Sequence, residues 1–341
     1  MAQQGGSQLD GSQGSSDAAS PGALVLDDEI AKLRDGGAVA FSQLLAAATA
    51  DLAYAGCDSP DSDATNLWLW ASGMSRTELF FERNRRIELE SEHPIHKFAE
   101  AIAQRARRVP LQQIMGTAAM RNLELQVGSG VFIPRPETEG LAQWALDWLA
   151  QQPQKSGATV LDLCTGSGAL ALAIADEAPA LGVRDLFIIA VERDPVAAQW
   201  AEKNLVQCQQ KWREDPYARK VQLIRGDTTD PPTTAQYFGS CDLVVSNPPY
   251  VPEDAAVSPE VTADPHQAVF GGEDGLDVIR PLLSIAAKLL RPGGGFAVEH
   301  DDSHGEVVTE LLHQTGAFAD IQLHHDLAGK PRFTSAVRTG N

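Results

Sequence analysis

The segment most suited to chemistry is Ser246-Asn-Pro-Pro-Tyr250, which directly follows the apolar stretch Asp242–Val245. An amide or aromatic NH2 group is a poor nucleophile because its lone pair is delocalised. A site that accepts hydrogen bonds from both N–H groups orients the nitrogen and favours the charge that develops on it. Asn247 offers a side-chain carbonyl oxygen, and Pro248 offers a backbone carbonyl that proline's fixed φ holds in place. The ring of Tyr250 can lie against a flat amide. The segment therefore predicts a site that alkylates a planar NH2 nitrogen.

A glycine-rich turn at Val160–Ala171 is the second candidate, because it connects an apolar run to a helical stretch. Gly166 and Gly168 let the backbone approach a ligand closely. The N-terminus of the following helix offers unpaired N–H groups to a carboxylate or phosphate. The turn also half-matches the dinucleotide fingerprint G-x-G-x-x-G/A, with Ala171 in the last place. It predicts a cofactor site but does not by itself identify the cofactor.

Two acidic residues are placed to hold the nucleoside part of such a cofactor. Glu192 ends an apolar strand, 24 residues after Gly168, where a carboxylate can accept hydrogen bonds from both ribose hydroxyls. Asp194 is a nearby competitor for this role. Asp227 follows Gly226 after a later apolar strand and can accept a hydrogen bond from an adenine amino group, although a turn-forming Gly-Asp pair explains it equally well.

The motifs lie in a region where apolar runs alternate with helical stretches. The runs are Thr159–Leu163, Leu186–Val191, Val221–Ile224, Leu243–Val245 and Gly295–Val298. This alternation predicts a parallel, doubly wound α/β sheet. Two further runs, Ile321–His324 and Phe333–Val337, are expected to form an antiparallel pair at one edge of that sheet.

The N-terminal part has a helical pattern instead. Apolar spacing predicts a helix over Phe41–Tyr54 that ends at Gly56, and a second helix that ends near Trp70. Ser75-Arg-Thr-Glu78 reads as a capping box that opens a short helix, and a longer helix is expected from about Glu90 to Arg108. The pair Trp68 and Trp70 is expected in the small core of this region.

These patterns divide the chain into four parts. Residues 1–26 are rich in Gly, Ser, Gln and Asp and are predicted to be a disordered tail. Residues 27–109 form the helical domain, and residues 110–130, where apolar and polar residues alternate, form a hairpin linker. Residues 131–341 form the α/β domain.

The composition limits the classes of substrate and partner that we expect for this protein. The 341 residues carry a net charge of −19, which favours a protein or small-molecule substrate over stable nucleic-acid binding. No apolar run of roughly 18 residues occurs and no signal-peptide pattern is present, so we expect a cytoplasmic protein without membrane contact. The four cysteines are scattered without a CxxC pair, which predicts reduced thiols and no metal site.

With these motifs the chain resembles the PrmC/HemK family, the protein-(glutamine-N5) methyltransferases of peptide chain release factors, from about residue 40 to residue 338. Arg108–Gly116 is similar to the family's interdomain "PLQYI-x-G" segment, and Val131–Glu139 is similar to its "IPRPETE" stretch. Leu161–Gly168 and Asn247–Tyr250 match the cofactor loop and the NPPY motif. Asp264–Leu276 resembles the loop that follows NPPY.

The resemblance implies a seven-stranded Rossmann-like class I methyltransferase domain, preceded by a small all-helical domain that recognises the substrate and by a β-hairpin linker. It implies S-adenosyl-L-methionine as methyl donor, S-adenosyl-L-homocysteine as product, and the GGQ glutamine of class 1 release factors as substrate. Carried over by position, the cofactor contacts are Cys164, Thr165, Gly166, Ser167, Gly168, Glu192, Thr228 and Asn247. Asp162 and Asp227 are predicted to join them. The glutamine amide would be held by Asn247, Pro248, Pro249 and Tyr250, with Asn247, Pro248 and Tyr250 as catalytic residues and Arg135 and Thr138 shaping the site.

The sequence departs from the family pattern at four places. Gln113 replaces the usual Tyr of the interdomain segment, and Cys164 stands where Gly is usual in the cofactor loop. Glu192 stands where Asp is common, and Ala118–Asn122 replaces an aromatic-rich hairpin. None of these changes affects the NPPY motif.

Three other functions compete with this interpretation. An N6-adenine nucleic-acid methyltransferase also uses NPPY on an exocyclic amine, but it must extract a base and grip phosphates, which the acidic composition disfavours. A nicotinamide-dependent oxidoreductase would use the glycine turn and Glu192 but leaves NPPY unexplained. A non-catalytic release-factor binding module would not need the intact motif.

Overall fold

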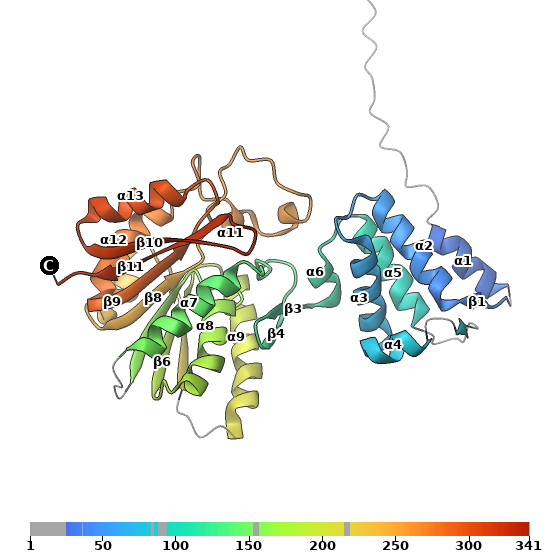
Figure 1. Ribbon diagram of the computed structural model, residues 1–341, viewed down its shortest axis with the longest axis horizontal. Coiled ribbons are helices and arrows are strands. Elements are labelled where there is room, and N and C mark those ends of the chain that lie inside the picture. The colour runs from blue at the N-terminus through green and yellow to red at the C-terminus, as the bar shows by residue number, and fades with distance from the viewer. Residues whose placement is uncertain are drawn as a thin grey trace, which may run out of the picture. The chain divides into compact units, whose positions relative to one another are not determined.

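The computed structural model describes residues 25–35, 37–82, 85–87, 94–152, 157–214 and 219–340. The chain divides into two compact units, residues Met1–Arg107 and Arg108–Asn341 (Figure 1). The tail predicted over residues 1–26 lies outside the described residues except for its last two, which begin the first helix.

The first unit is helical. Its helices are α1 (Val25–Arg34), α2 (Phe41–Tyr54), α3 (Pro60–Ser72), α4 (Arg76–Glu82) and α5 (Ile95–Ala106). Two short strands, β1 (Val39–Ala40) and β2 (Arg86–Ile87), pair antiparallel. The core centres on Trp68, whose ring lies 4.6 Å from that of Phe41 and 5.3 Å from that of Phe98. Trp70 differs from the prediction: it is half-buried, and the Lys97 ammonium lies 3.6 Å above its ring at the surface.

The first unit contains most of the helix signals predicted from its sequence. Helix α2 has the predicted bounds, and Gly56 follows it with the positive φ (74°) of a C-terminal cap. The capping box is confirmed, since the Ser75 amide donates to Glu78 Oε2 at 2.8 Å and the Glu78 amide donates to Ser75 Oγ at 3.2 Å. Helix α5 begins at Ile95 rather than near Glu90, and residues 88–93 lie outside the described part of the chain.

The second unit is built on a seven-stranded sheet. Its strands are β5 (Ala158–Leu163), β6 (Leu186–Glu192), β7 (Arg219–Arg225), β8 (Cys241–Ser246), β9 (Leu290–Glu299), β10 (Phe318–His325) and β11 (Pro331–Arg338). Their order in the sheet is β10-β11-β9-β8-β5-β6-β7. The pairs among β5 to β9 are parallel, whereas β11 pairs antiparallel with both β9 and β10. The predicted α/β fold and its antiparallel edge are therefore confirmed.

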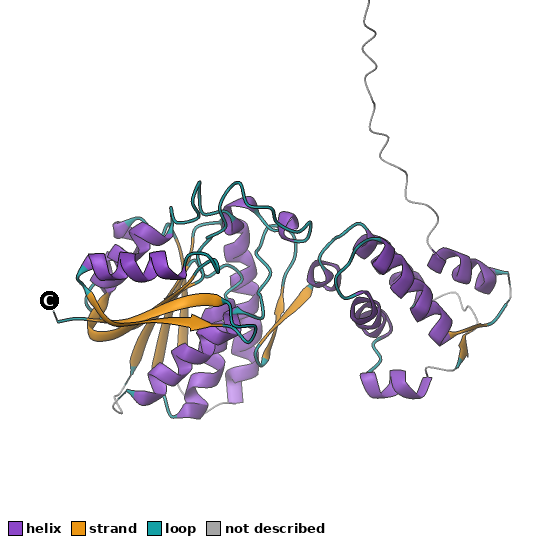
Figure 2. Cartoon of the chain, turned by 45° about the horizontal axis from the view of Figure 1, so that its top comes forward, coloured by secondary structure: helices purple, strands orange, loops and turns teal. Residues whose placement is uncertain are grey.

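Helices cover both faces of this sheet (Figures 1 and 2). The longer ones are α7 (Thr138–Gln151), α8 (Ala169–Glu177), α9 (Pro195–Lys211), α12 (Ile279–Leu289) and α13 (Gly305–Thr315). Short turns are α10 (Pro231–Thr234), α11 (His266–Val269), η1 (Ala178–Leu181), η2 (Trp212–Glu214), η3 (Ala235–Tyr237) and η4 (Val261–Ala263). One core packs α7 and α8 against the sheet, and a second core packs α12 and α13 against its other face. Strands buried on both faces explain the near-continuous apolar runs in the sequence.

The predicted linker is only partly a hairpin. Its first residues form the short helix α6 (Leu111–Met115), and the hairpin proper consists of β3 (Thr117–Met120) and β4 (Leu123–Gln126). The alternation of apolar and polar residues lies C-terminal to these residues, so it did not predict the helical turn. Gly116 ends this turn with a φ of 77°. The hairpin belongs to the second unit, where Asn204 on α9 bonds both the amide and the carbonyl of Gln126 at 2.7 and 3.0 Å.

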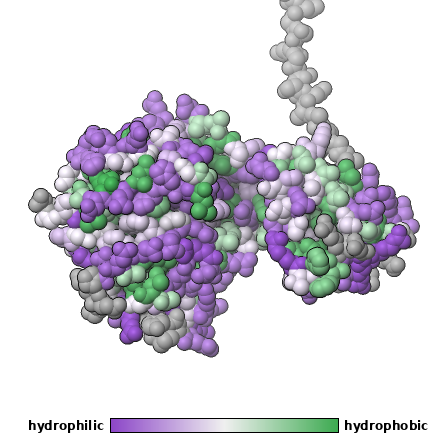
Figure 3. All heavy atoms as spheres, viewed as in Figure 1, coloured by the Kyte–Doolittle hydropathy of each residue, from purple (hydrophilic) through white to green (hydrophobic). Residues whose placement is uncertain are grey.

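The strand order creates the place for a ligand site. The chain leaves β5 toward β6 on one side, and later places β8 on the other side of β5. Helices then diverge above the carboxyl ends of β5 and β8, which leaves a crevice at this switch point. The visible face of this unit is mostly hydrophilic, with scattered apolar patches (Figure 3). No helix among the described residues is long and apolar enough to cross a membrane.

Candidate active site

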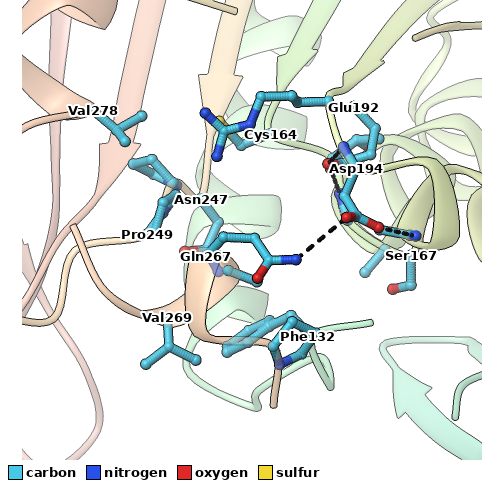
Figure 4. A pocket seen from close by; sticks show the side chains of 18 of the residues that line it. Phe132, Cys164, Ser167, Glu192, Asp194, Asn247, Pro249, Gln267, Val269 and Val278 are labelled. Atoms are coloured by element: carbon cyan, nitrogen blue, oxygen red, sulfur yellow. Dashed lines mark hydrogen bonds between the residues drawn. The ribbon is translucent and has the colours of Figure 1, made fainter. Parts of the chain in front are cut away.

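A pocket of about 210 Å³ opens at the carboxyl ends of β5, β6 and β8. Figure 4 shows Asn247, Pro249 and Val278 on one side of it and Glu192, Asp194 and Ser167 on the other. The predicted site residues that line it are Arg135, Thr138, Asp162, Cys164, Thr165, Gly166, Ser167, Glu192, Asp227, Thr228, Asn247, Pro248, Pro249 and Tyr250. Segments more than 100 residues apart in sequence thus meet at one cavity.

The NPPY segment presents two unused acceptors at this pocket. Asn247 Nδ2 donates to Thr138 Oγ1 at 3.1 Å, so the amide nitrogen faces α7 and the Oδ1 oxygen faces away from it. Among the described residues, neither Asn247 Oδ1 nor the Pro248 carbonyl accepts a hydrogen bond from the protein. A carbonyl oxygen without a protein partner in a pocket is available to a ligand N–H.

The loop that contains Val269 and Gly271 packs closely against the backbone of the NPPY segment. The amides of Tyr250 and Val251 both donate to the Val269 carbonyl, at 3.2 and 3.0 Å. A Cβ on Gly271 would lie 2.7 Å from the Pro249 carbonyl and 2.6 Å from that of Gly275, so any side chain there would displace the loop. Gly271 therefore lets a second loop support the NPPY turn directly.

The glycine turn shows why its residue types matter. Gly166 has a φ of 58° and Gly168 a φ of 85°, the left-handed region that favours glycine. Cys164 has a φ of 64°, so the usual glycine at this position is replaced by a residue in a strained conformation. Gly168 does not line the pocket; a Cβ there would lie 3.1 Å from Leu172, which indicates a packing role where α8 begins.

Asp162, on β5 beneath the turn, has an incomplete set of partners. Its Oδ2 accepts from Thr165 Oγ1 at 2.5 Å and from the Ala171 amide at 3.1 Å. Its Oδ1 is buried and has no partner among the described residues. Burial raises the pKa of this carboxyl to about 7, against the lowering effect of the hydrogen bonds from Thr165 and Ala171. A buried, unpartnered carboxylate oxygen beside a pocket fits a cationic ligand group.

Glu192 ends β6 and connects two loops. Its Oε2 accepts from the Gly166 amide at 2.8 Å, and its Oε1 accepts from the Asp194 amide at 2.7 Å. Burial raises its pKa, and these backbone hydrogen bonds oppose that effect. Asp194, the competing acid, caps α9 instead: its Oδ1 accepts from the amides of Val196 and Ala197 at 2.8 and 2.9 Å.

Asp227 stabilises its own turn and also lines the pocket. Its Oδ1 accepts from the Thr229 amide and hydroxyl at 2.8 and 2.6 Å, and its Oδ2 pairs with Arg193 at 3.4 Å. The two roles considered from the sequence, turn former and adenine acceptor, are compatible with this position. Thr228 is buried, with its hydroxyl 3.5 Å from Cys164 Sγ.

The segment before α7 supplies Arg135 and Thr138. Arg135 pairs with the buried Asp264 at 2.5 Å and lies 5.1 Å from the ring of Phe132. Burial raises the pKa of Asp264 to about 6, and Arg135 lowers it. Arg135 therefore holds the loop after NPPY as well as lining the pocket.

Several residues that line the pocket had no role predicted from the sequence, among them Phe132, Gln267 and Val278. Gln267 on α11 reaches across to Asp194 Oδ2 at 3.3 Å, the dashed line at the centre of Figure 4. Phe132 and Gln267 lie in two segments that resemble the family, Val131–Glu139 and Asp264–Leu276, so the resemblance could have indicated that they lie near the site. Val278 lies just beyond them and carried no signal.

The cysteines and the possible metal ligands complete the description of the described residues. All four cysteines are free, and burial raises the pKa of the Cys164 thiol to about 12, so it is not a thiolate near neutral pH. In the described part of the chain, no three His, Cys, Asp or Glu side chains gather to hold a metal ion.

Comparisons with known proteins agree with the motifs. The model for the PrmC N-terminal domain matches residues 43–116, and that for "Conserved hypothetical protein 95" matches residues 112–264. A release factor glutamine methyltransferase of Corynebacterium glutamicum is 44% identical over 296 residues, covering 87% of this chain and 98% of that protein. One of Mycobacterium tuberculosis is 39% identical over 300 residues, covering 88% and 92%. A methyltransferase crystal structure from Pyrococcus furiosus matches with a TM-score of 0.44 and 16% identity, covering 65% of this chain and 92% of that one.

Proposed function

The chain belongs to the release factor glutamine methyltransferase family, and from this premise we propose that it methylates the side-chain amide nitrogen of the glutamine in the GGQ motif of class 1 release factors. The methyl donor is S-adenosyl-L-methionine, which supplies an electrophilic methyl group on a positively charged sulfur, and the product is S-adenosyl-L-homocysteine. The exocyclic amine of adenine, the alternative acceptor, is not favoured by the family or by the net charge of −19.

The observation that carries this proposal is the pair of unused acceptors at the NPPY turn. Asn247 Oδ1 and the Pro248 carbonyl can each accept one N–H of a primary amide, which aligns the amide plane and leaves its nitrogen facing the donor. As the new N–C bond forms, the nitrogen becomes positive and its protons more acidic, so both hydrogen bonds strengthen in the transition state. The ring of Tyr250 borders the same pocket. The alkylated nitrogen is acidic enough that no strong base is required.

The pocket residues fit the proposed donor. Asp162 Oδ1, buried and without a partner among the described residues, suits the ammonium of an amino acid. Glu192 keeps free lone pairs on both carboxylate oxygens after its backbone hydrogen bonds, and these suit two ribose hydroxyls. Cys164, Thr165, Ser167, Asp227 and Thr228 would complete the contacts around the nucleoside and amino-acid parts.

Cofactor binding is expected to depend on pH through Asp162. Its pKa of about 7 means that the carboxyl is protonated in the free protein at lower pH, whereas pairing with an ammonium requires the ionised form. Binding below this pKa must release a proton, so affinity for S-adenosylhomocysteine should fall as pH falls through about 7, approaching tenfold per pH unit. Titration calorimetry from about pH 5.5 to 8 measures this dependence.

The matched variant for that experiment is Asp162→Asn, which keeps the shape of the side chain. It should bind more weakly at pH 8 and lose the pH dependence. A wild-type affinity that stays constant across the range, or an equally steep dependence in the variant, would remove Asp162 from the proposed ammonium site.

We also propose that the helical unit of residues 25–107 recognises the release factor, with the hairpin and the α/β domain forming the catalytic unit. A release factor acts on ribosomes, so this substrate implies a cytoplasmic location. No nucleic acid or membrane partner is part of the proposal.

The direct test offers three acceptors to the purified full-length protein with radiolabelled methyl donor: a class 1 release factor, duplex DNA and RNA. Label should enter only the release factor, and the rate should change little with salt, since no phosphate contacts are involved. A release factor whose GGQ glutamine is replaced by alanine should take up no label. Incorporation into DNA or RNA instead of the release factor would favour the adenine alternative.

A further inference from the structure

The strap, residues 260–267, is a part of the pocket wall that polar contacts hold in place. It follows the NPPY turn and contains η4 and the first two residues of α11. Val261, Pro265 and Gln267 of the strap line the pocket. Asp264 is its one buried residue, so apolar packing does little to fix this segment. The side-chain contacts along the strap therefore determine where this wall of the pocket lies.

The contact at the start of the strap is an ion pair between Glu260 and Arg108, which both belong to the second unit. Arg108 Nε donates to Glu260 Oε1 at 2.6 Å, and Nη2 donates to Oε2 at 2.7 Å. The two side chains are 21% and 16% exposed. An ion pair open to solvent contributes little, whereas a bidentate pair that is largely shielded from water fixes the orientation of both groups. The pair thus joins the strap to a segment 152 residues earlier in the chain.

The backbone of Arg108 supports a role for its side chain. Its φ is 65°, in the left-handed region where a residue with a Cβ is strained and glycine is not. An observed strain of this kind points to a functional constraint on the residue that bears it. The bidentate contact with Glu260 is one that glycine could not make. The strained backbone and the ion pair are therefore two separate observations that indicate the same side chain.

Other contacts hold the strap at a second point. Asp264 pairs with Arg135 and accepts a hydrogen bond from the Ile133 amide at 3.4 Å. Val261 lies in the chain between this point and the Arg108 contact, so its position depends on both. Without the Arg108 contact, the first half of the strap would be attached only at its far end.

The side chains of Val261 and Pro265 indicate which ligand this wall faces. Neither is charged or forms hydrogen bonds, so neither suits the amino-acid part or the ribose hydroxyls of the methyl donor. The candidate contacts for those groups follow β5, β6 and β7, whereas the strap continues the chain after β8 and the NPPY turn. An apolar wall on this side of the pocket suits a segment of the protein substrate.

Building on the proposed function, we propose that Arg108 is a positioning residue for substrate recognition: its pair with Glu260 holds Val261 and Pro265 as the wall against which the release factor segment that carries the glutamine packs. Arg108 is not among the residues that line the pocket, so it acts through Glu260 and the strap. The effect of the pair is on binding of the protein substrate rather than on the methyl transfer step.

The test replaces Arg108 by glycine in the full-length protein. Glycine adopts a φ of 65° without strain, so the melting temperature should stay within about 3 °C of wild type. We expect the KM for the release factor to rise roughly tenfold, with kcat and the dissociation constant for S-adenosylhomocysteine within about threefold of wild type. The acceptors of the NPPY turn stay in place, because Thr138 still binds Asn247 and the Val269 carbonyl still binds the turn. A purely structural role would instead lower the melting temperature and weaken cofactor binding together.

A double-mutant cycle identifies the path of the effect. Glu260→Gln keeps the size of the side chain but ends the ion pair, so it should raise KM about as much as Arg108→Gly, and the double variant should raise it by no more than about threefold further. Arg108→Lys keeps the charge without the bidentate contact and should have an intermediate KM. The matched control is Arg291→Ala, which removes an equally short, half-buried pair with Asp242 at the opposite end of β8 and should keep the wild-type KM.

The outcomes separate this inference from the proposed function. If the wild-type protein does not methylate a release factor, the proposed function fails, and this inference fails with it. If the wild type is active, a KM for Arg108→Gly within about threefold of wild type overturns only the positioning role. Multiplied effects in the double variant, or an equal loss of S-adenosylhomocysteine binding, would do the same. Should Arg108→Gly not fold, wild-type KM values in both Arg108→Lys and Glu260→Gln would contradict the inference.

Discussion

Replacing Asn247 by alanine is expected to lower kcat for release factor methylation by about 100- to 1,000-fold, while S-adenosylhomocysteine binds with near-normal affinity. The variant keeps the backbone carbonyl of Pro248 but loses the side-chain oxygen that the Thr138 hydrogen bond directs to the pocket. The remaining single acceptor neither fixes the amide plane nor compensates for the charge on the nitrogen. Single-turnover rates at saturating donor, with calorimetry for the product, measure the two effects separately.

The matched control is Asn122→Ala, the same chemical change at an exposed position in the turn between β3 and β4. It should have wild-type rates and affinity. Normal turnover by Asn247→Ala would refute the role of this residue. Loss of S-adenosylhomocysteine binding in step with turnover would show instead that Asn247 serves the cofactor.

Replacing Glu192 by alanine should weaken S-adenosylhomocysteine binding by roughly 100-fold. The substitution removes two charged acceptors for the ribose and also releases the amides of Gly166 and Asp194, which Glu192 holds at 2.8 and 2.7 Å. The KM for the methyl donor should rise, whereas kcat, measured at saturating donor, should stay near the wild-type value. The reason is that Glu192 does not contact the reacting nitrogen in the proposed site.

Two variants make this prediction specific. Glu192→Gln keeps one acceptor and should fall between the wild type and alanine, while Glu202→Gln, on the exposed surface of α9, should bind normally. An alanine variant that binds S-adenosylhomocysteine within about threefold of wild type would contradict the ribose role.

The sequence predicted the parts of the fold that depend on local pattern. Strands buried on both faces leave continuous apolar runs, so β5, β6 and β8 were identified with their ends near the motifs. The sequence placed the glycine turn and the NPPY segment each after a strand, and the two meet at one pocket because the carboxyl ends of parallel strands lie at one edge of the sheet. The 14-residue helix α2 was predicted with its observed bounds, since its apolar spacing and Gly56 are both local signals.

Other features could not be predicted from local pattern, for different physical reasons. The helical turn of α6 is five residues long, too short for periodicity to distinguish it from the hairpin that follows. Gly168 resembles a ligand-binding glycine in sequence; in the structure it has a φ of 85° and precedes α8 outside the pocket lining. Glu299 stands 49 residues after Tyr250 and in no motif, so only the folded sheet reveals that its carboxylate meets the Tyr250 hydroxyl.

In the proposed reaction, two carbonyl oxygens of the NPPY turn present a glutamine amide for methylation, and mass spectrometry of the release factor shows where the methyl group is attached. After incubation with wild-type protein and S-adenosylmethionine, the peptide that contains GGQ should carry one added methyl group. Fragment ions should place this group on the glutamine side chain, and Asn247→Ala should leave the peptide unmodified. A methyl group at another residue, or an unmodified peptide under conditions where the protein turns over its donor, would rule out the proposed role of the NPPY turn.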